Sequence, residues 1–259
     1  MKKKIILSIL VLAVLAFGVY RVIVEIKIHK TPTVIEDLCY SKRYKKDGLV
    51  YVMENGVYTP YIAIDTKNYG KDAVILVRQT AWLEEMMYRD ENIYGVGGAY
   101  YPGSIVDNFL EGVVYNAYSD GMKGIIRNAP VKVHTIEFVS KHFSKCPPNL
   151  ETIYRHVFAL SSAETGIKGS PMKGEDEGKL IPEIIENSDV YYTWLRSEAF
   201  GGDDTRAAMM RGPEGASSHI QNDDESYVRP VFTVKRSEPI ELRTLDTEQG
   251  TVYVFSADK

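Results

Sequence analysis

The segment Tyr191–Val234 constrains the fold of this chain more than any other stretch. Its two ends, with the sequences WLRS and VRPVF, are apolar and aromatic with one arginine set into each, and the span between them is rich in Gly, Asp and Ser. This pattern predicts two core strands joined by a long loop region, with Trp194 and Phe232 as core anchors. Arginines buried beside such anchors need carboxylate or carbonyl partners, so we predict structural roles for Arg196 and Arg229.

The composition is that of an ordinary globular protein. Of 259 residues, which allow one large domain or two small ones, 44% are apolar and 25% are charged. The net charge is −4, so no global field favours polyanions and we expect no nucleic-acid partner. Tyrosine is abundant, with 18 residues. Its ring packs while its hydroxyl stays hydrated, which suits half-exposed strands and binding surfaces alike.

The amino terminus has the pattern of an export signal. Three lysines, residues 2–4, precede an uncharged and mostly apolar run from Ile5 to Tyr20, which Arg21 ends. This pattern is typical of a secretory signal, or of a signal anchor whose lysines stay in the cytoplasm. The run is short for a spanning helix, but residues 22–24 extend it and Arg21 can snorkel to the interface. We expect residues 1–24 to form an uncleaved transmembrane anchor, with cleavage and secretion as the alternative. In both cases the rest of the chain is exported.

The remaining chain predicts a stalk followed by one domain of mixed structure. Residues 25–46 are basic and weakly periodic, and we interpret them as a stalk leading to a domain at residues 47–259. Asn55-Gly56 supplies the positive φ of a tight hairpin, and serines 104, 119 and 161 stand at capping positions before short helices. The expected strands are 49–53, 58–65, 73–79, 131–139, 157–160, 240–245 and 252–255, and the expected helices include 82–88 and 119–127. Strands, then helices, then more strands favour an α+β fold.

Four blocks of the sequence, in order, resemble one known family. They are Tyr101-Pro102-Gly103-Ser104-Ile105 with Tyr115-Asn116-Ala117-Tyr118-Ser119, then Val157-Phe158-Ala159-Leu160-Ser161 with Glu164, then Trp194-Leu195-Arg196-Ser197, and finally Val228-Arg229-Pro230. The chain resembles the bacterial domain-of-unknown-function family 6273 over roughly residues 49–234. The resemblance implies a C-type-lectin-like mixed sheet with helices, distantly similar to the formylglycine-generating, sulfatase-modifying fold. It implies no activity, because the family has none established.

Two residues depart from the family pattern. Glu198 stands where the family has proline, and Tyr227 stands where it has glycine before Val-Arg-Pro. Both flank the polar span, so they affect the expected shape of that region and not the expected fold. Formylglycine-generating chemistry uses a late cysteine pair, and no cysteine follows Cys146 here, so the resemblance does not extend to that chemistry.

The sequence holds no catalytic or metal-binding motif that we recognise. The acidic cluster Asp203-Asp204 and Asp223-Asp224-Glu225 lacks the spacing of an EF-hand loop, and we interpret it as solvated loop acids. The five histidines show no i, i+4 pair, and no serine stands in a nucleophile elbow. Cys39 and Cys146 lack metal-type spacing and fit either a disulfide or two free thiols. We therefore expect no metal, no cofactor and no enzymatic activity.

Recognition is the function that these residues favour. The span from Glu198 to Tyr227 would be a long loop region displayed from a rigid sheet, with Arg206, Arg211, His219 and Tyr227 as its candidate ligand-binding residues. Trp194, Arg196, Arg229 and Pro230 form the structural family motif. We predict a membrane-anchored, extracellular binding or surface-structural module for a glycan, cell-wall or protein ligand. The alternatives are an enzyme of unrecognised type that joins the acids to His219, and a component of a secreted or phage-tail-like assembly.

Overall fold

The computed structural model describes most of the chain. The described residues are 2–29, 31–89, 99–137, 149–165, 192–201, 204–211, 215–219, 225–245 and 250–258, and of these, 2–11, 26–29, 198–201, 204–211 and 215–219 are described by their backbone alone. The helices are α1 (Lys2–His29), α2 (Ile35–Leu38), α3 (Ile105–Phe109), the π-helical turn η1 (Leu110–Val114), α4 (Tyr115–Ala117), α5 (Asp120–Ile125) and α7 (Ser162–Thr165).

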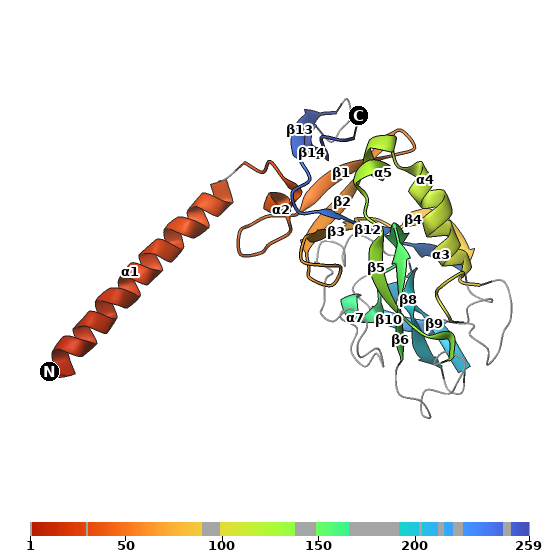
Figure 1. The fold of residues 1–259 in the computed structure, drawn as a ribbon, viewed down its shortest axis with the longest axis horizontal. Coiled ribbons are helices and arrows are strands. Elements are labelled where there is room, and N and C mark those ends of the chain that lie inside the picture. The colour runs from red at the N-terminus through yellow and green to blue at the C-terminus, as the bar shows by residue number, and fades with distance from the viewer. Residues whose placement is uncertain are drawn as a thin grey trace.

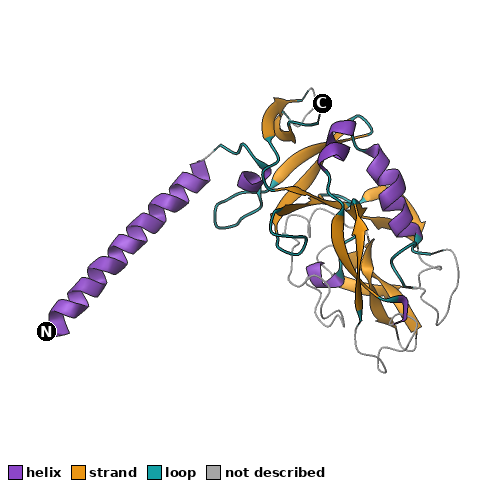
Figure 2. Ribbon diagram, viewed as in Figure 1, coloured by secondary structure: helices purple, strands orange, loops and turns teal. Residues whose placement is uncertain are grey.

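Strands make up most of the globular body (Figure 2). They are β1 (Leu49–Glu54), β2 (Val57–Asp65), β3 (Ala73–Arg78), β4 (Trp82–Met87), β5 (Ala129–His134), β6 (Leu150–Arg155), β7 (Val157–Phe158), β8 (Tyr192–Gly201), β9 (Asp204–Arg211), β10 (Gly215–His219), β11 (Glu225–Val228), β12 (Val231–Lys235), β13 (Ile240–Thr244) and β14 (Thr251–Phe255). The fold is therefore mixed α and β with a predominance of sheet, which agrees with the expected class.

The strands form three sheets. One has seven strands in the order β13-β14-β1-β2-β3-β12-β7, one has five in the order β10-β9-β8-β11-β4, and β5 and β6 form a hairpin. Only two pairings among the described strands are parallel, β1 with β14 and β8 with β11. The pairing of β1 with β14 brings the first and last strands of the domain together (Figure 1).

Aromatic side chains fill the core, as the sequence predicts. Trp194 on β8 and Phe232 on β12 are both buried, which confirms their assignment as core anchors. The Phe232 ring lies 5.2 Å from the rings of Tyr61 and Tyr118, measured between centroids. The phenol oxygens of these two tyrosines are 2.7 Å apart, so their buried polar ends satisfy each other.

The turn and helix-capping residues predicted from the sequence are confirmed where the interacting residues lie within a few positions of each other. Asn55 and Gly56 both have positive φ, 48° and 81°, and join β1 to β2. Ser104 accepts the N–H of Asp107 at 3.1 Å to cap α3. Before α7, the Glu164 carboxylate accepts the Ser161 N–H at 2.9 Å, and the Glu164 N–H donates to the Ser161 hydroxyl at 3.2 Å. This reciprocal pair is the predicted capping box.

Two expected conformations are wrong. Residues 82–88, expected to be helical, contain β4, which pairs with β11 through the register Met87↔Glu225. The helix formers of β4 are overridden because strand pairing supplies backbone partners from a distant segment. The polar span expected to be a loop contains β9 and β10, which continue from β8 through the pairs Trp194↔Met209 and Ala207↔His219. Polar composition does not prevent a segment from forming a strand when its backbone groups pair with a neighbouring strand, as β10 pairs with β9 and β9 with β8.

The expected stalk is also partly wrong. Its second half contains α2, where Ile35, Leu38 and Cys39 are buried in the main core. Backbone bonds hold this turn to the domain, because the Ile35 N–H donates to the Glu238 carbonyl at 2.9 Å. An i, i+3, i+4 spacing of apolar residues is enough to dock a single helical turn.

Helix α1 projects from the globular body, which it contacts through Tyr20 and Arg43. It runs without interruption for 28 residues, past the expected end of the anchor at residue 24, and Figure 1 shows it pointing away from the sheets. The apolar side chains of Leu12, Val14, Leu15, Phe17, Val19, Val22 and Ile23 are exposed, and that of Val24 is half-buried. In the part of the chain that the structure describes, no helix is both long and apolar enough to cross a membrane.

Candidate functional site

Arg196, on β8, forms an ion pair in the core. The residue is 1% exposed, and its Nη1 lies 2.7 Å from Oε2 of the fully buried Glu164. The guanidinium also donates to the carbonyl oxygens of Ala159 and Lys132, at 2.8 and 3.2 Å. The other oxygen of Glu164 accepts the Tyr69 hydroxyl. The carboxylate and carbonyl partners predicted for this arginine are therefore present, and they join β5, β7, α7 and β8.

Arg229 and Pro230 join the end of β3 to β12. The Arg229 side chain is buried, and its Nη1 donates to the carbonyl oxygen of Arg78 at 3.0 Å and to that of Gln79. The Pro230 carbonyl oxygen in turn accepts the Arg78 N–H at 3.0 Å. The motif thus fixes two backbone segments that are about 150 residues apart in sequence.

Two further buried carboxylates have arginine partners that the sequence did not reveal. The Arg78 guanidinium contacts Glu54 on β1, with Nε 3.2 Å from both carboxylate oxygens. Arg155 binds Asp107 through two bonds of 2.8 and 2.7 Å, and these bonds raise the pKa of Arg155. Ser104, which caps α3, was recognisable in the sequence, but the arginine that binds Asp107 in the same turn lies 48 positions away. Only the tertiary fold brings the two together.

Trp194 anchors the second sheet by packing and by one hydrogen bond. Its Nε1 donates to the carbonyl oxygen of Met86 on β4 at 2.7 Å. The indole meets the ring of Tyr88 edge-on, with 5.4 Å between centroids. A buried indole N–H is thereby satisfied, as such groups usually are.

The predicted ligand-binding residues lie on strands and not on one loop. Arg206 and Arg211 belong to β9 and His219 ends β10; the side chains of these three lie outside the described residues. Tyr227 is half-buried on β11, paired with Thr193 of β8. Strand β8 lies between β9 and β11, so at about 4.8 Å per strand the backbone of Tyr227 is about 10 Å from β9.

Most of the acidic cluster lies outside the described residues. Asp203, Asp223 and Asp224 lie outside the described residues, Asp204 begins β9, and Glu225 begins β11 with an exposed side chain. Among the described residues, no group of three or more His, Cys, Asp or Glu side chains is placed to hold a metal ion.

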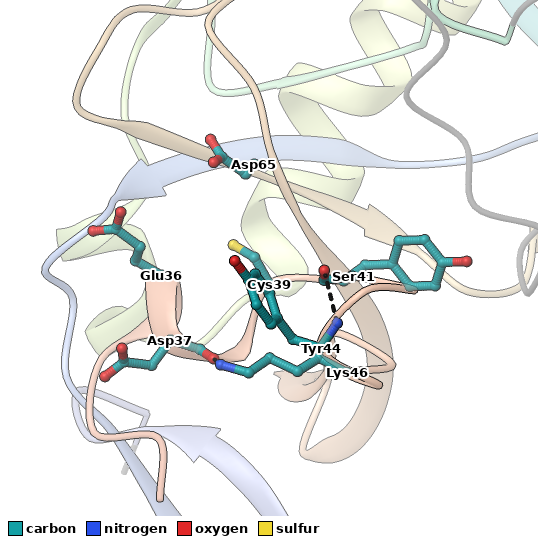
Figure 3. Close-up of a pocket in the computed structure, with 8 residues that line it drawn as sticks. Glu36, Asp37, Cys39, Ser41, Tyr44, Lys46 and Asp65 are labelled. Atoms are coloured by element: carbon teal, nitrogen blue, oxygen red, sulfur yellow. Dashed lines mark hydrogen bonds between the residues drawn. The ribbon is translucent and has the colours of Figure 1, made fainter. Parts of the chain in front are cut away.

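A solvent-accessible pocket lies beside α2, in the segment expected to be a stalk (Figure 3). Its volume is about 330 Å³. It is lined by Glu36, Asp37, Cys39, Tyr40, Ser41, Tyr44, Lys46 and Asp65, which come from α2, the loop after it and the end of β2. Figure 3 shows the carboxylates of Glu36 and Asp65 on one side of the Cys39 thiol and Tyr44 and Lys46 on the other.

Two of the acids that line this pocket, Glu36 and Asp65, are paired with an arginine. Arg236 binds both the Glu36 carboxylate, at 2.8 Å, and the Asp65 carboxylate, so these two acids are partly neutralised. The Lys46 ammonium donates to the Asp37 carbonyl oxygen. The pocket therefore offers phenol, carboxylate and hydroxyl groups suited to hydrogen-bonding a polar ligand.

Cys39 is an unreactive member of the pocket wall. It carries a free, buried thiol whose Sγ lies 3.6 Å from the Ile35 carbonyl oxygen. Burial, and secondarily the nearby Asp65 carboxylate, raise the pKa of the Cys39 thiol to about 12. Such a thiol is not a nucleophile at neutral pH. Cys146 lies outside the described residues.

Comparison with known proteins identifies the family alone. A family described as "Domain of unknown function (DUF6273)" matches residues 71–236, well over half of the chain. No curated protein and no solved structure matches the chain. The matched region includes the buried arginines of β8 and of the β11–β12 junction, together with the capping box before α7. On this match, the chain belongs to the DUF6273 family.

Proposed function

We propose that this chain is a non-catalytic binding or surface-structural module, held on the outer face of a cell membrane by helix α1. The observation that carries the proposal is the row of exposed apolar side chains on α1, outside the core. The run from Ile5 to Val24, which Arg21 interrupts, extends for about 30 Å at 1.5 Å per residue, and this is the thickness of the hydrocarbon core of a bilayer. Lipid would remove these side chains from water.

The charge pattern supports the proposed orientation. Lys2, Lys3 and Lys4 precede the apolar run, and lysines flanking a single span favour the cytoplasmic side. The domain that follows α1 would then be extracellular. Secretion after cleavage is the alternative outcome.

The engagement of the buried acids supports a non-catalytic role. Glu54, Asp107 and Glu164 are each bound by an arginine and by further donors within the protein. A catalytic acid or base instead needs access to a substrate proton. We assign ligand binding to the pocket beside α2, with glycans, cell-wall fragments and extracellular peptides as the ligand classes.

We also infer a C-type-lectin-like architecture for the domain. Its support is the ordered resemblance of the four sequence blocks, together with the pairing of the first and last strands of the domain, β1 and β14. The test is an experimental structure superposed on C-type lectin domains. A different strand connectivity would reject the inference.

Membrane attachment is tested by fractionating cells that express the full chain. We expect the protein to stay with membranes after alkaline carbonate washing, and external protease to digest the domain in intact cells. A full-length protein found in the cytosol would refute the proposal. A shortened chain in the medium would favour cleavage and secretion.

Ligand binding is tested by thermal shift of the full chain in detergent, with and without calcium, against glycans and peptidoglycan fragments. A ligand at a hundredfold excess over its Kd stabilises the folded state by about 2.7 kcal/mol. The Tyr44→Ala variant should lose this shift, while Tyr154→Ala, at an exposed position on β6, should keep it. A shift that survives Tyr44→Ala would move the site away from the pocket.

A further inference from the structure

A short loop after α2 presents positive charge towards α1. We call residues 41–46 the basic loop. Two backbone bonds close it, from the Ser41 N–H to the Lys46 carbonyl oxygen at 2.9 Å and from the Lys46 N–H to the Ser41 carbonyl oxygen at 3.0 Å. Lys45 makes the turn with a φ of 51°. The loop is therefore a defined hairpin-like element that holds its tip in a fixed place.

The tip of the basic loop carries three exposed cations, Lys42, Arg43 and Lys45. The fourth cation, Lys46, is turned inward, where its ammonium donates to the Asp37 carbonyl oxygen. The tip thus places three exposed cations within four residues, on a protein whose net charge is −4.

The contact between Arg43 and the Tyr20 ring places the tip of the basic loop beside residue 20 of α1. The Arg43 guanidinium lies 4.7 Å from the ring centroid of Tyr20 and 5.3 Å from that of Tyr44. Tyr20 is the last residue of the uncharged run, and the next residue, Arg21, lies 5.7 Å from the Phe17 ring. Tyrosine and arginine at the end of an apolar helix mark the membrane–water interface.

The tip of the basic loop therefore lies beside Tyr20, the residue at which the apolar run of α1 ends. Helix α1 continues for nine residues beyond Tyr20, which is about 13 Å. Figure 1 shows the loop after α2 on the side of the body from which α1 emerges. A domain joined only by a helix end could lie anywhere around it, but the contact of Arg43 with Tyr20 holds the tip beside the helix.

We propose that the basic loop docks on anionic phospholipid headgroups of the bilayer that holds α1, and so fixes the domain against the membrane surface. This proposal rests on the proposed membrane attachment. Lysine and arginine near an anionic surface bind its phosphates, with an effect of about fivefold in affinity for each cation. Because the loop also forms one wall of the pocket through Ser41 and Tyr44, docking would turn the pocket towards the membrane.

The test is hydrogen exchange of residues 41–46 in the full chain, reconstituted in nanodiscs of phosphatidylcholine alone or with one quarter phosphatidylglycerol. We expect exchange of this segment to slow by at least about fivefold in the anionic discs. The difference should disappear in 1 M salt, where the Debye length falls to about 3 Å. Soluble glycerol phosphate added to the neutral discs should not reproduce it.

Two matched variants make the test specific. Lys42→Gln/Arg43→Gln/Lys45→Gln should exchange equally in both discs, with the exchange of β3 unchanged as a check of folding. The control Lys67→Gln/Lys132→Gln/Lys235→Gln removes three exposed lysines elsewhere and should behave as the wild type.

The outcomes separate this inference from the proposed function. Equal exchange of the basic loop in both discs, or equal slowing by glycerol phosphate, would overturn lipid docking and leave the anchor standing. Failure of the chain to incorporate into either disc would overturn the anchor and the docking with it. Slowing that persists in the loop variant would show that other residues are responsible.

Discussion

Replacing Arg196 with methionine should destabilise the domain more than any exposed charge change. The substitution removes the guanidinium bound to Glu164, leaving that carboxylate buried with no cation beside it. It also removes the donor to the carbonyl oxygens of Ala159 and Lys132. Breaking a fully buried pair in this way costs about 3–5 kcal/mol. For a chain of this length, that loss lowers Tm by about 6–20 °C.

The assay is equilibrium unfolding of the full chain in detergent, followed by tryptophan fluorescence. Trp194 is buried two residues from the substitution, so its emission reports the affected region. The matched control is Arg236→Met, which removes an arginine paired with Glu36 and Asp65, whose side chains are 54% and 58% exposed. The Arg236 side chain is itself 17% exposed and also donates to the Lys71 carbonyl oxygen, but pairs with acids this exposed contribute at most about 1 kcal/mol each. This variant should therefore lose no more than about 2 kcal/mol, which is less than the loss expected for Arg196→Met.

A second variant distinguishes the destabilisation caused by the unpaired Glu164 carboxylate from that caused by the lost packing of Arg196. Adding Glu164→Gln to Arg196→Met should recover part of the stability, because a neutral side chain costs less to bury than an unpaired carboxylate. The reasoning is refuted if Arg196→Met is no more destabilising than Arg236→Met, or if the double variant is less stable than the single one.

Two further predictions concern α5 and the pocket thiol. A Cβ built on Gly121 would lie 1.7 Å from the carbonyl oxygen of Ala257, whereas one on Gly124 meets nothing within 4 Å; thermal melts should show Gly121→Ala strongly destabilised and Gly124→Ala unchanged or more stable by up to about 1 kcal/mol. In a Cys146→Ser background, Cys39 has a folded pKa of about 12 against an ordinary 9.0, so at pH 8 it should react with iodoacetamide about a thousandfold more slowly than in the unfolded chain. Since the folded pKa is the higher one, the contribution of the neutral thiol to stability is complete below pH 9 and declines as pH rises towards 12. Equal rates in the folded and unfolded chains would contradict the burial of Cys39.

The parts of the fold that were predictable depend on neighbours within a few residues. The capping box of Ser161 and Glu164 and the positive φ of Asn55 and Gly56 are local chemistry, and both are found as predicted. The prediction of a helix at Trp82–Tyr88 was wrong because the segment instead forms a strand that pairs with β11, which is about 140 residues away in sequence. No local window contains that information.

The candidate site was missed for a related reason. The sequence EIKIHKTPTVIEDLCYSKRYKK is basic overall, and this average composition led to the prediction of a stalk. The segment nevertheless contains a turn in which Ile35, Leu38 and Cys39 are buried. Their i, i+3, i+4 spacing was the available signal. The pocket itself was not predictable, because Asp65 lines it from the end of β2, and the arginine that pairs with Asp65, Arg236, comes from beyond β12.

The residues that identify the family and the residues open to a ligand are different sets. The family match spans residues 71–236, and within it Arg196, Arg229 and Trp194 are buried and hold strands together. The pocket beside α2 is lined only by residues between Glu36 and Asp65, and the basic loop lies in the same interval. Family membership therefore predicts the scaffold of this protein and says nothing about that surface. Variants between residues 36 and 65 are where a change in binding without a change in folding should be sought first.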